Sequence, residues 1–196
     1  VVDDYLRHDG ALAGLSEVIA AGKVRIGGIA CEEAHPTALA PLVAHPAVSI
    51  LNIWLNMLNP SSLLDLSPIR VNGPADYRGM ARMAAENGVA IAGFRALGGG
   101  ALMSAAANTL TRHPIAGGGF TRNAAQYKRE VELAARLVTR LGIQGTNAMA
   151  ALAYRFNITD PRITTTVAGF SELSHLHGAI DGLRKGALSE DEMQSI

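Results

Sequence analysis

The stretch Val89-Ala90-Ile91-Ala92-Gly93-Phe94, followed at once by Arg95-Ala96-Leu97-Gly98-Gly99-Gly100, decides the fold class. Its first half is short and apolar and follows a helix-like segment, which is typical of a strand buried on both faces of a parallel sheet. Its second half places three glycines directly after that strand, where parallel α/β folds bind their ligands. The pattern therefore predicts an α/β fold whose binding loops follow its strands.

Three further runs of the same kind occur along the chain, namely Val24 to Ile29, Val48 to Ile53 and Ile163 to Val167. Helix-like segments separate the strands, so we expect about four parallel strands with flanking helices. This is the later part of a (β/α)8 TIM barrel, and the opening part is expected upstream of Val1, which is not a start methionine. The 196 residues, 48% of them hydrophobic, are expected to form a single domain.

Turn and capping residues predict where two of the helices begin and end. Asp9 or Gly10 is expected to open the first helix, and Ala20-Ala21-Gly22 to close it. Asp76 is expected to cap a later helix that ends near Asn87-Gly88.

Two connections are much longer than the about 2 to 6 residues usual in α/β units. They run from Asn56 to Ala75 and from Arg95 to Phe120, and both follow strands. In a (β/α)8 barrel the loops after strands build the active-site face, so we expect both connections to serve function.

Composition excludes several classes of function. Lys plus Arg and Asp plus Glu both total 17, and no long basic run is present, so we expect no nucleic-acid partner. A stretch of about 18 apolar residues without charge or glycine is absent, which predicts neither a membrane segment nor a signal peptide. The single cysteine, Cys31, excludes an internal disulfide and favours a reducing compartment, so a cytoplasmic location is expected.

Four segments carry a family resemblance. Gly22-Lys23-Val24-Arg25-Ile26-Gly27-Gly28-Ile29 resembles the "G-K-V-R-x-I-G-V" segment of aldo-keto reductases, and Leu55 to Pro60 resembles their "Y-N-L-L-x-P". Glu86 to Leu102 is similar to "E-x-G-V-x-V…P-L-G-x-G-x-L". The end of the chain resembles the family's end in Met149 to Phe156, Val167 to Ser171 and Ala187 to Ser189. The resemblance spans nearly the whole chain and implies the family's C-terminal portion, roughly from the fourth helix and fifth strand of the barrel onward.

The resemblance implies that the catalytic residues lie upstream. The family uses an Asp, Tyr, Lys and His set on the earlier strands, where Tyr protonates a carbonyl while reduced nicotinamide delivers hydride. His8 is the one histidine that faintly matches, but Asp3, Asp4 and Arg7 interrupt the apolar run that a buried strand needs. We therefore expect His8 to be a solvated surface residue, and we assign no catalytic residue within this chain.

The resemblance further implies a cofactor site, with NADP or NAD as the cofactor and NADP favoured. Asn52 and Phe94 fall where the family holds the nicotinamide, and the alternative for Phe94 is a core residue. The loop after the third strand corresponds to the pyrophosphate side and contributes Arg95, Leu97, Gly98 and Gly99, unless its glycines merely make it flexible. The segment that corresponds to the adenosine-side phosphate contributes Gly169, Phe170, Ser171 and His175.

Two places depart from the family pattern. Ala30-Cys31 replaces a usual Ser-Asn pair, and Gly178-Ala179 replaces a frequent Glu-Asn pair that holds adenine. Residues 169–179 also lack an evident basic residue to bind the extra phosphate of NADP. NAD and NADP therefore both stay open as cofactors.

Two functions remain open. The first is the cofactor-binding part of a nicotinamide-dependent aldo-keto reductase whose substrate is a small aldehyde, ketone or alcohol. The second is a non-catalytic half-barrel that binds a dinucleotide weakly or only self-associates through open sheet edges. A metal-dependent hydrolase is disfavoured because carboxylate and histidine clusters are missing, and His175 and His177, two apart, make a poor metal pair.

Overall fold

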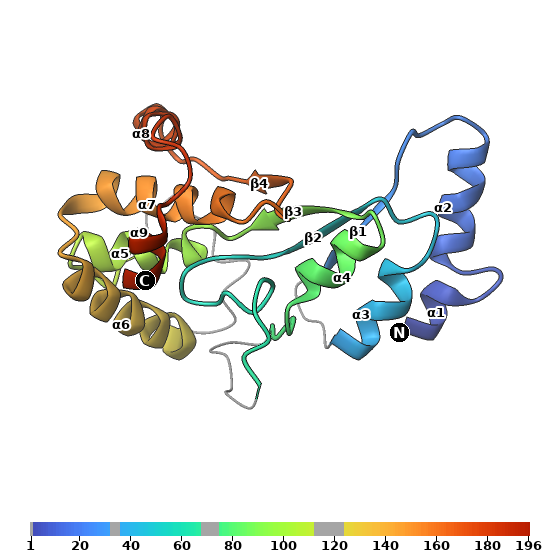
Figure 1. Cartoon of the computed structure of the whole chain (residues 1–196), viewed down its shortest axis with the longest axis horizontal. Coiled ribbons are helices and arrows are strands. Elements are labelled where there is room, and N and C mark those ends of the chain that lie inside the picture. The colour runs from blue at the N-terminus through green and yellow to red at the C-terminus, as the bar shows by residue number, and fades with distance from the viewer. Residues whose placement is uncertain (1, 32–35, 68–74, 112–123) are drawn as a thin grey trace. The chain divides into compact units, whose positions relative to one another are not determined.

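The computed structural model describes residues 2–31, 36–67, 75–111 and 124–196 (Figure 1). By its contacts the chain divides into two compact units. Unit 1 comprises Val1–Trp54, Ser61–Gly93 and Arg162–Thr165, and unit 2 comprises Leu55–Pro60, Phe94–Pro161 and Thr166–Ile196. The expectation of a single domain stays a prediction. The long connections predicted after the strands run partly through residues 68–74 and 112–120, which lie outside the described residues.

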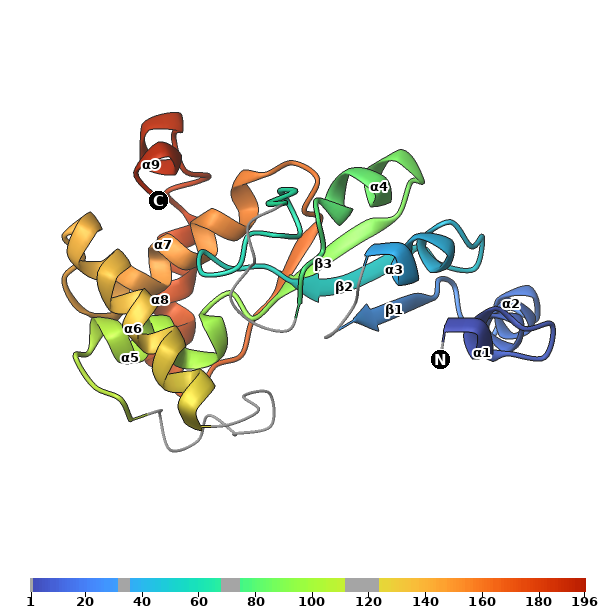
Figure 2. The same ribbon diagram turned by 90° about the horizontal axis from the view of Figure 1, so that it is seen from below.

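The sheet has four parallel strands, as predicted, and their order is β1-β2-β3-β4. They are β1 (Gly28–Cys31), β2 (Ile50–Trp54), β3 (Ala90–Phe94) and β4 (Thr165–Val167). Figure 2 shows β1 and β2 side by side, and their register pairs Gly28 with Ile50 and Cys31 with Ile53. Because the two middle strands have neighbours on both sides, their side chains supply most of the buried strand residues.

The first predicted strand is wrong at its start. β1 begins at Gly28 rather than Val24, and Val24 and Ile26 are 40% and 63% exposed. Pairing with the segment that leads into β2 begins one residue before β1, where the Ser49 N–H donates to the Gly27 carbonyl at 2.9 Å. An apolar run predicts a strand buried on both faces, but β1 and β4 are the outer strands of this sheet and are largely exposed.

Helix ends follow the turn residues more closely than helix starts do. α2 has Gly10 at its N-cap and ends before Gly22, whose φ is +69°, so both predicted ends are confirmed. α4 ends at Glu86 as predicted, but its N-cap is Gly79, and Asp76 instead accepts from the Arg78 N–H at 3.3 Å. The helix starts too late for Asp76 to cap it.

The helices are α1 (Val2–Leu6), α2 (Ala11–Ala20), α3 (Pro36–Val43), α4 (Met80–Glu86), α5 (Ala101–Ala106), α6 (Ala124–Leu141), α7 (Gly145–Thr159), α8 (Leu173–Leu183) and α9 (Glu190–Ser195), with a short 3-10 turn at Gly98–Gly100.

A fully buried tyrosine joins the ends of two strands in unit 1. The Tyr77 hydroxyl donates to the Cys31 carbonyl at 2.6 Å and accepts from the Trp54 N–H at 3.3 Å. The Tyr77 N–H in turn donates to Ser61 Oγ at 3.2 Å. One side chain therefore links the carboxyl ends of β1 and β2 to the segment before α4.

Tyr77→Phe is expected to lower the free energy of unfolding by about 1 to 3 kcal/mol, because it removes a buried hydroxyl while the Cys31 carbonyl stays in place. Urea denaturation followed by circular dichroism measures this loss. Tyr5→Phe is the matched control, since Tyr5 is 40% exposed and should change stability by less than about 0.5 kcal/mol. Equal urea midpoints for the two variants would show that the Tyr77 hydroxyl contributes nothing.

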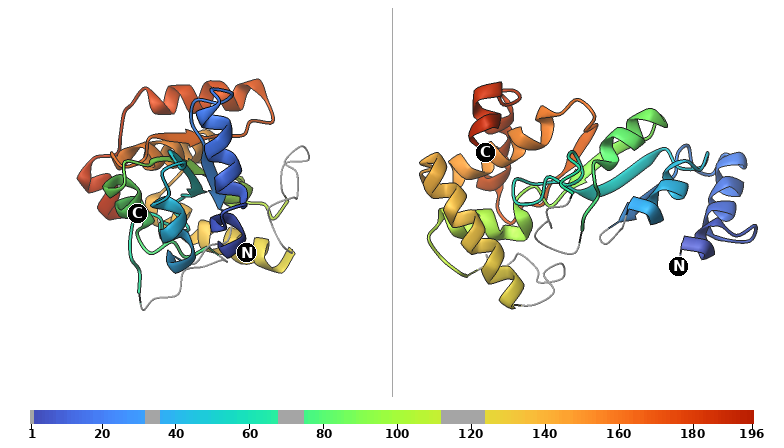
Figure 3. Two further views of the ribbon diagram at one scale, coloured as in Figure 1. Left: turned by 90° about the vertical axis from the view of Figure 1, so that its right-hand side faces the viewer. Right: turned by 60° about the horizontal axis from the view of Figure 1, so that its bottom comes forward.

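Unit 2 is built on α7. This helix packs along α8 and also contacts α5, which itself packs along α6 (Figure 3). A small core cluster of Ala96, Ala150, Tyr154 and Ala179 joins the loop after β3 to α7 and α8. Ala168, which follows β4, packs against the same cluster, so the loops after β3 and β4 are held against the same helices.

Candidate functional site

A cavity of about 660 Å³ lies in unit 2, a volume in the usual range for a small-molecule site. The loops after β3 and β4 line it, together with residues of α5, α7 and α8. The loops after β3 and β4, about 70 residues apart in the sequence, thus line the same cavity. This agrees with the expectation that binding loops follow the strands of a parallel sheet. The predicted site residues that line this cavity are Arg95, Leu97, Gly99, Gly169, Phe170, Ser171 and His175.

Three predicted site residues lie outside the cavity lining. Gly98 is buried, and a Cβ added to it would stand 3.2 Å from Leu58 Cδ1. Phe94 is half-buried at the end of β3. Asn52 belongs to β2 in unit 1, where its buried Oδ1 has no hydrogen-bond partner. The roles predicted for Asn52 and Phe94 toward a nicotinamide therefore stay predictions.

Sequence reasoning missed the cavity residues on α5 and α7. Asn147, Ala150 and Tyr154 of α7 line it, as do Met103 and Ser104 of α5. The three α7 residues follow the i, i+3, i+7 spacing of one helix face, which was a readable signal. Recognising it required knowing that this face of α7 meets the two loops.

The glycine triplet after β3 adopts a left-handed backbone. Gly98, Gly99 and Gly100 have φ values of +60°, +63° and +97°. At Gly99 a Cβ would lie 2.5 Å from Arg95 Nη2, so the absence of a side chain leaves room for the guanidinium at this position. The N–H groups of Gly98 and Gly100 donate to the carbonyls of Arg95 and Leu97 at 2.7 and 3.0 Å. These two amides hold the loop itself together.

Arg95 forms a buried ion pair at the cavity wall. Its Nη2 lies 3.6 Å from Glu130 Oε2, with the two side chains only 7% and 8% exposed. The other Glu130 oxygen accepts from Gln126 Nε2 at 3.2 Å. Arg95 also holds φ = +64°, which is uncommon for a residue with a side chain and concentrates at functional sites. Glu130 was missed because a charged residue on a helix is usually solvated.

Two aromatic rings also line the cavity. The Tyr154 and Phe170 ring centroids are 6.2 Å apart at an interplanar angle of 44°. Tyr154 is buried, and this burial raises its pKa to about 12, so the phenol stays neutral near pH 7. Phe170 is 42% exposed, so part of its ring surface is open to contact.

The start of α8 carries a carboxylate as well as amides. Glu172 is the N-cap, and its Oε2 accepts from the Ser174 hydroxyl at 3.2 Å. A helix N-terminus favours an anion, but Glu172 already supplies one beside Ser171.

The remaining observations concern metal ligands, membrane spans, Cys31 and His8. Across the ranges 2–31, 36–67, 75–111 and 124–196, no group of three or more His, Cys, Asp or Glu side chains could hold a metal ion. None of the helices described within those ranges is long and apolar enough to cross a membrane. Burial raises the pKa of the Cys31 thiol to about 11, which disfavours a nucleophilic role. The His8 side chain is 95% exposed, in agreement with a solvated histidine.

Comparison with known proteins identifies the family. The sequence matches the model of the Aldo/keto reductase family over residues 2–196. Among solved structures, the chain is similar to the aldo-keto reductase AKR11C1 from Bacillus halodurans in its holo form, with a TM-score of 0.67 and 15% sequence identity. The match covers 100% of this chain and 56% of that one, so this chain spans about half the length of the protein it matches. No curated protein gave a significant match. The four parallel strands with their flanking helices match part of a TIM barrel, and the chain belongs to the aldo/keto reductase family.

Proposed function

We propose that this chain is the C-terminal, cofactor-binding part of a nicotinamide-dependent aldo-keto reductase. The parent enzyme would interconvert a small aldehyde or ketone and its alcohol by hydride transfer. Membership of the family and the match to about half of a solved member support this proposal. The chain's own residues would bind and orient the cofactor, and we assign none of them a catalytic role.

The cavity in unit 2 is the observation that carries the proposal. A reduced nicotinamide cofactor supplies hydride when bound, and its adenosine and diphosphate groups need an aromatic surface, polar side chains and positive charge. The cavity offers the Phe170 ring, Asn147 and Thr146 of α7, and Arg95. Asn52 and Phe94 do not line the cavity, so we assign to it the adenosine and diphosphate groups only.

The identity of the dinucleotide is part of the proposal. NADP and NAD are both compatible with this site, and the family resemblance favours NADP. His175 lines the cavity on α8, where it could contact the adenosine ribose or its phosphate. A cytoplasmic location stays a prediction from the single cysteine, Cys31.

Phe170→Ala is expected to weaken binding of NADH or NADPH by about tenfold, because a base that stacks on an aromatic ring gains roughly 1 to 3 kcal/mol. Titration of the chain with each reduced cofactor, followed by the cofactor's own fluorescence, measures this change. Tyr5→Ala is the control, since Tyr5 is 40% exposed and lies on α1 in unit 1. If neither cofactor binds at millimolar concentration, the proposed function is wrong.

Self-association is the second candidate function, and the exposure of β1 favours it. Gly28 and Ala30 are exposed in this outer strand, and Ile26 just before it is 63% exposed. An outer strand with apolar neighbours can pair with another chain. Sedimentation velocity at increasing concentration separates the candidates: a chain that binds no cofactor but forms defined oligomers supports the second.

A further inference from the structure

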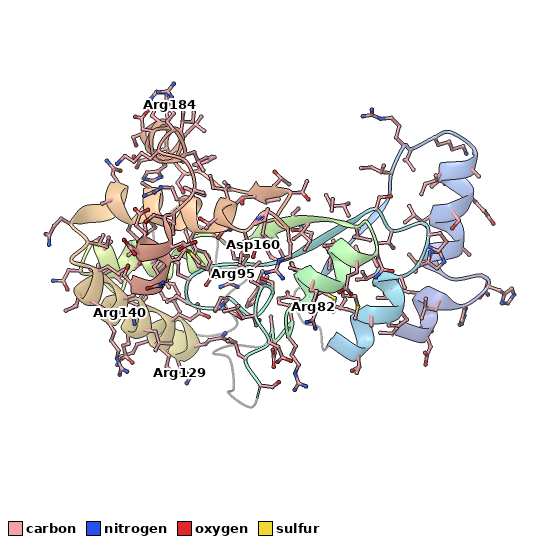
Figure 4. The ribbon with its side chains drawn as sticks, viewed as in Figure 1. Arg82, Arg95, Arg129, Arg140, Asp160 and Arg184 are labelled. Atoms are coloured by element: carbon pink, nitrogen blue, oxygen red, sulfur yellow. The ribbon has the colours of Figure 1, made fainter. Side chains whose placement is uncertain are left out.

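The buried Arg95–Glu130 pair has a role that cofactor binding alone does not explain. Arg95 lines the cavity. Glu130, on α6, is buried and is not one of the lining residues. Arg95 belongs to unit 2, and in Figure 4 Arg129 and Arg140 extend outward from α6. Both side chains of the pair are less than one tenth exposed, so their charges interact through protein rather than water.

The geometry of this pair permits exchange of partners. The 3.6 Å between Arg95 Nη2 and Glu130 Oε2 exceeds the about 2.7 to 2.9 Å of a close charged hydrogen bond. Gln126 holds the other carboxylate oxygen at 3.2 Å, so Glu130 keeps its place if Arg95 turns away. Gly99 leaves room for the guanidinium beside the loop, where a Cβ would be only 2.5 Å from Nη2.

The loop offers an anion the Arg95 guanidinium more readily than the amides of Gly98 and Gly100. The Gly98 and Gly100 N–H groups already donate within the loop. The guanidinium can bind two phosphate oxygens at once, but its charge is offset by Glu130 as long as that carboxylate is ionised. The affinity of the cavity for an anion therefore depends on a residue that does not touch the ligand.

We propose that Glu130 limits the affinity of this cavity for diphosphate groups by neutralising Arg95, and that Arg95 exchanges Glu130 for the diphosphate of a bound ligand. The proposal rests on the proposed function, because it takes the cavity as the adenosine diphosphate site. Uncharged parts of the ligand are then bound at full strength, whereas the diphosphate must displace a carboxylate. Release of the cofactor is correspondingly easier.

Glu130→Gln tests the proposal, with adenosine 5′-diphosphate and uncharged adenosine as probes in calorimetric titrations of the whole chain. Glutamine keeps the side-chain length, and its oxygen can still accept from Gln126 Nε2. We expect the diphosphate to bind about tenfold more tightly at low salt, and adenosine to bind as before. Glu132→Gln is the matched control: it removes the same charge from the same helix, but its side chain is 55% exposed and should change neither affinity.

A second pair of variants shows whether the effect passes through Arg95. Arg95→Gln should weaken diphosphate binding about tenfold, and it should cancel the gain when combined with Glu130→Gln. The proposal is overturned if Glu130→Gln weakens diphosphate binding, or if its gain persists without Arg95. If the unaltered chain binds neither adenosine 5′-diphosphate nor NADH, the proposed function fails and takes this inference with it.

A measurement on the unaltered chain covers the case in which Glu130→Gln does not fold. The guanidinium nitrogen signals of Arg95 in a nuclear magnetic resonance titration should shift with adenosine 5′-diphosphate and stay in place with adenosine. Signals that respond equally to both probes, or to neither while the diphosphate binds, would contradict the exchange of partners.

Discussion

Gly182→Leu is expected to lower the free energy of unfolding by about 3 kcal/mol or more, because it forces α8 away from α7. A Cβ at Gly182 would stand 2.6 Å from Ala151 Cα and 2.7 Å from Ala151 Cβ, closer than real atoms approach. The contact is with a helix backbone, which cannot give way as a flexible side chain can. Since α8 carries His175 and Gly178 of the cavity lining, ligand affinity should fall as well.

The control for this variant is Gly14→Leu. Gly14 also lies within a helix, α2, and an added Cβ there meets nothing within 4 Å. Leucine is the better helix former by roughly 0.5 to 1 kcal/mol, so Gly14→Leu should leave stability unchanged or raise it. Urea denaturation of both variants measures the difference. Similar losses at both positions would mean that the packing of α7 on α8 is not as close as the structure has it.

Arg155→Ala is expected to release the end of the chain. The Arg155 guanidinium donates to the carbonyls of Gly186 and Ala187 at 2.9 and 3.0 Å, and its Nη1 and Nη2 bind both oxygens of Glu192 at 2.7 and 2.8 Å. Removal of one side chain thus frees α9 and the turn before it. Limited proteolysis should cut within residues 186–196 about tenfold faster in the variant, because local unfolding of this segment becomes easier.

Arg184→Ala is the control for Arg155→Ala. Arg184 pairs with Asp181 at 2.9 Å, but their side chains are 75% and 69% exposed, and such surface pairs contribute little. Proteolysis at the C-terminus should proceed at the original rate in this variant. Equal acceleration in both variants would show that Arg155 does not hold the tail.

The ion pair between Arg155 and Glu192 also predicts a pH dependence of stability. Hydrogen bonds from Arg155 and from the Ser189 backbone lower the pKa of Glu192 from 4.5 to about 2. Because the folded chain holds this carboxylate ionised, the Arg155–Glu192 pair stabilises the C-terminal segment fully above about pH 4.5. This stabilisation is lost as the pH falls toward 2. The stability difference between the unaltered chain and Glu192→Gln should therefore shrink over this interval. A difference that is constant from pH 7 to pH 3 would contradict the assigned pKa.

Local signals in the sequence predicted where the helices and strands lie better than they predicted which of these elements are buried. The runs around Ile91 and Ile53 became central strands, and Gly22 and Gly88 follow helix ends, because backbone preferences act within a few residues. The run at Val24 was wrong at its start since hydropathy does not say whether a neighbouring strand or helix covers it. Burial of β1 depends on what lies beside the sheet.

The candidate site was predictable only in part, for a similar reason. The glycine loop and the Gly169 segment carry recognisable patterns, and both line the cavity. Glu130 carries no pattern of its own, and the helix-face spacing of Asn147 became informative only once α7 was placed beside the two loops. A side chain that acts through long-range packing leaves little trace in local sequence.

The most direct test of the account is a nuclear magnetic resonance titration of the isotope-labelled chain with NADH and with NADPH. If the cavity in unit 2 holds the adenosine and diphosphate groups, the largest amide shifts should fall in residues 95–104, 146–154 and 167–178, which contain most of its lining. Binding with shifts confined to unit 1, or spectra unchanged by either cofactor at millimolar concentration, would contradict it.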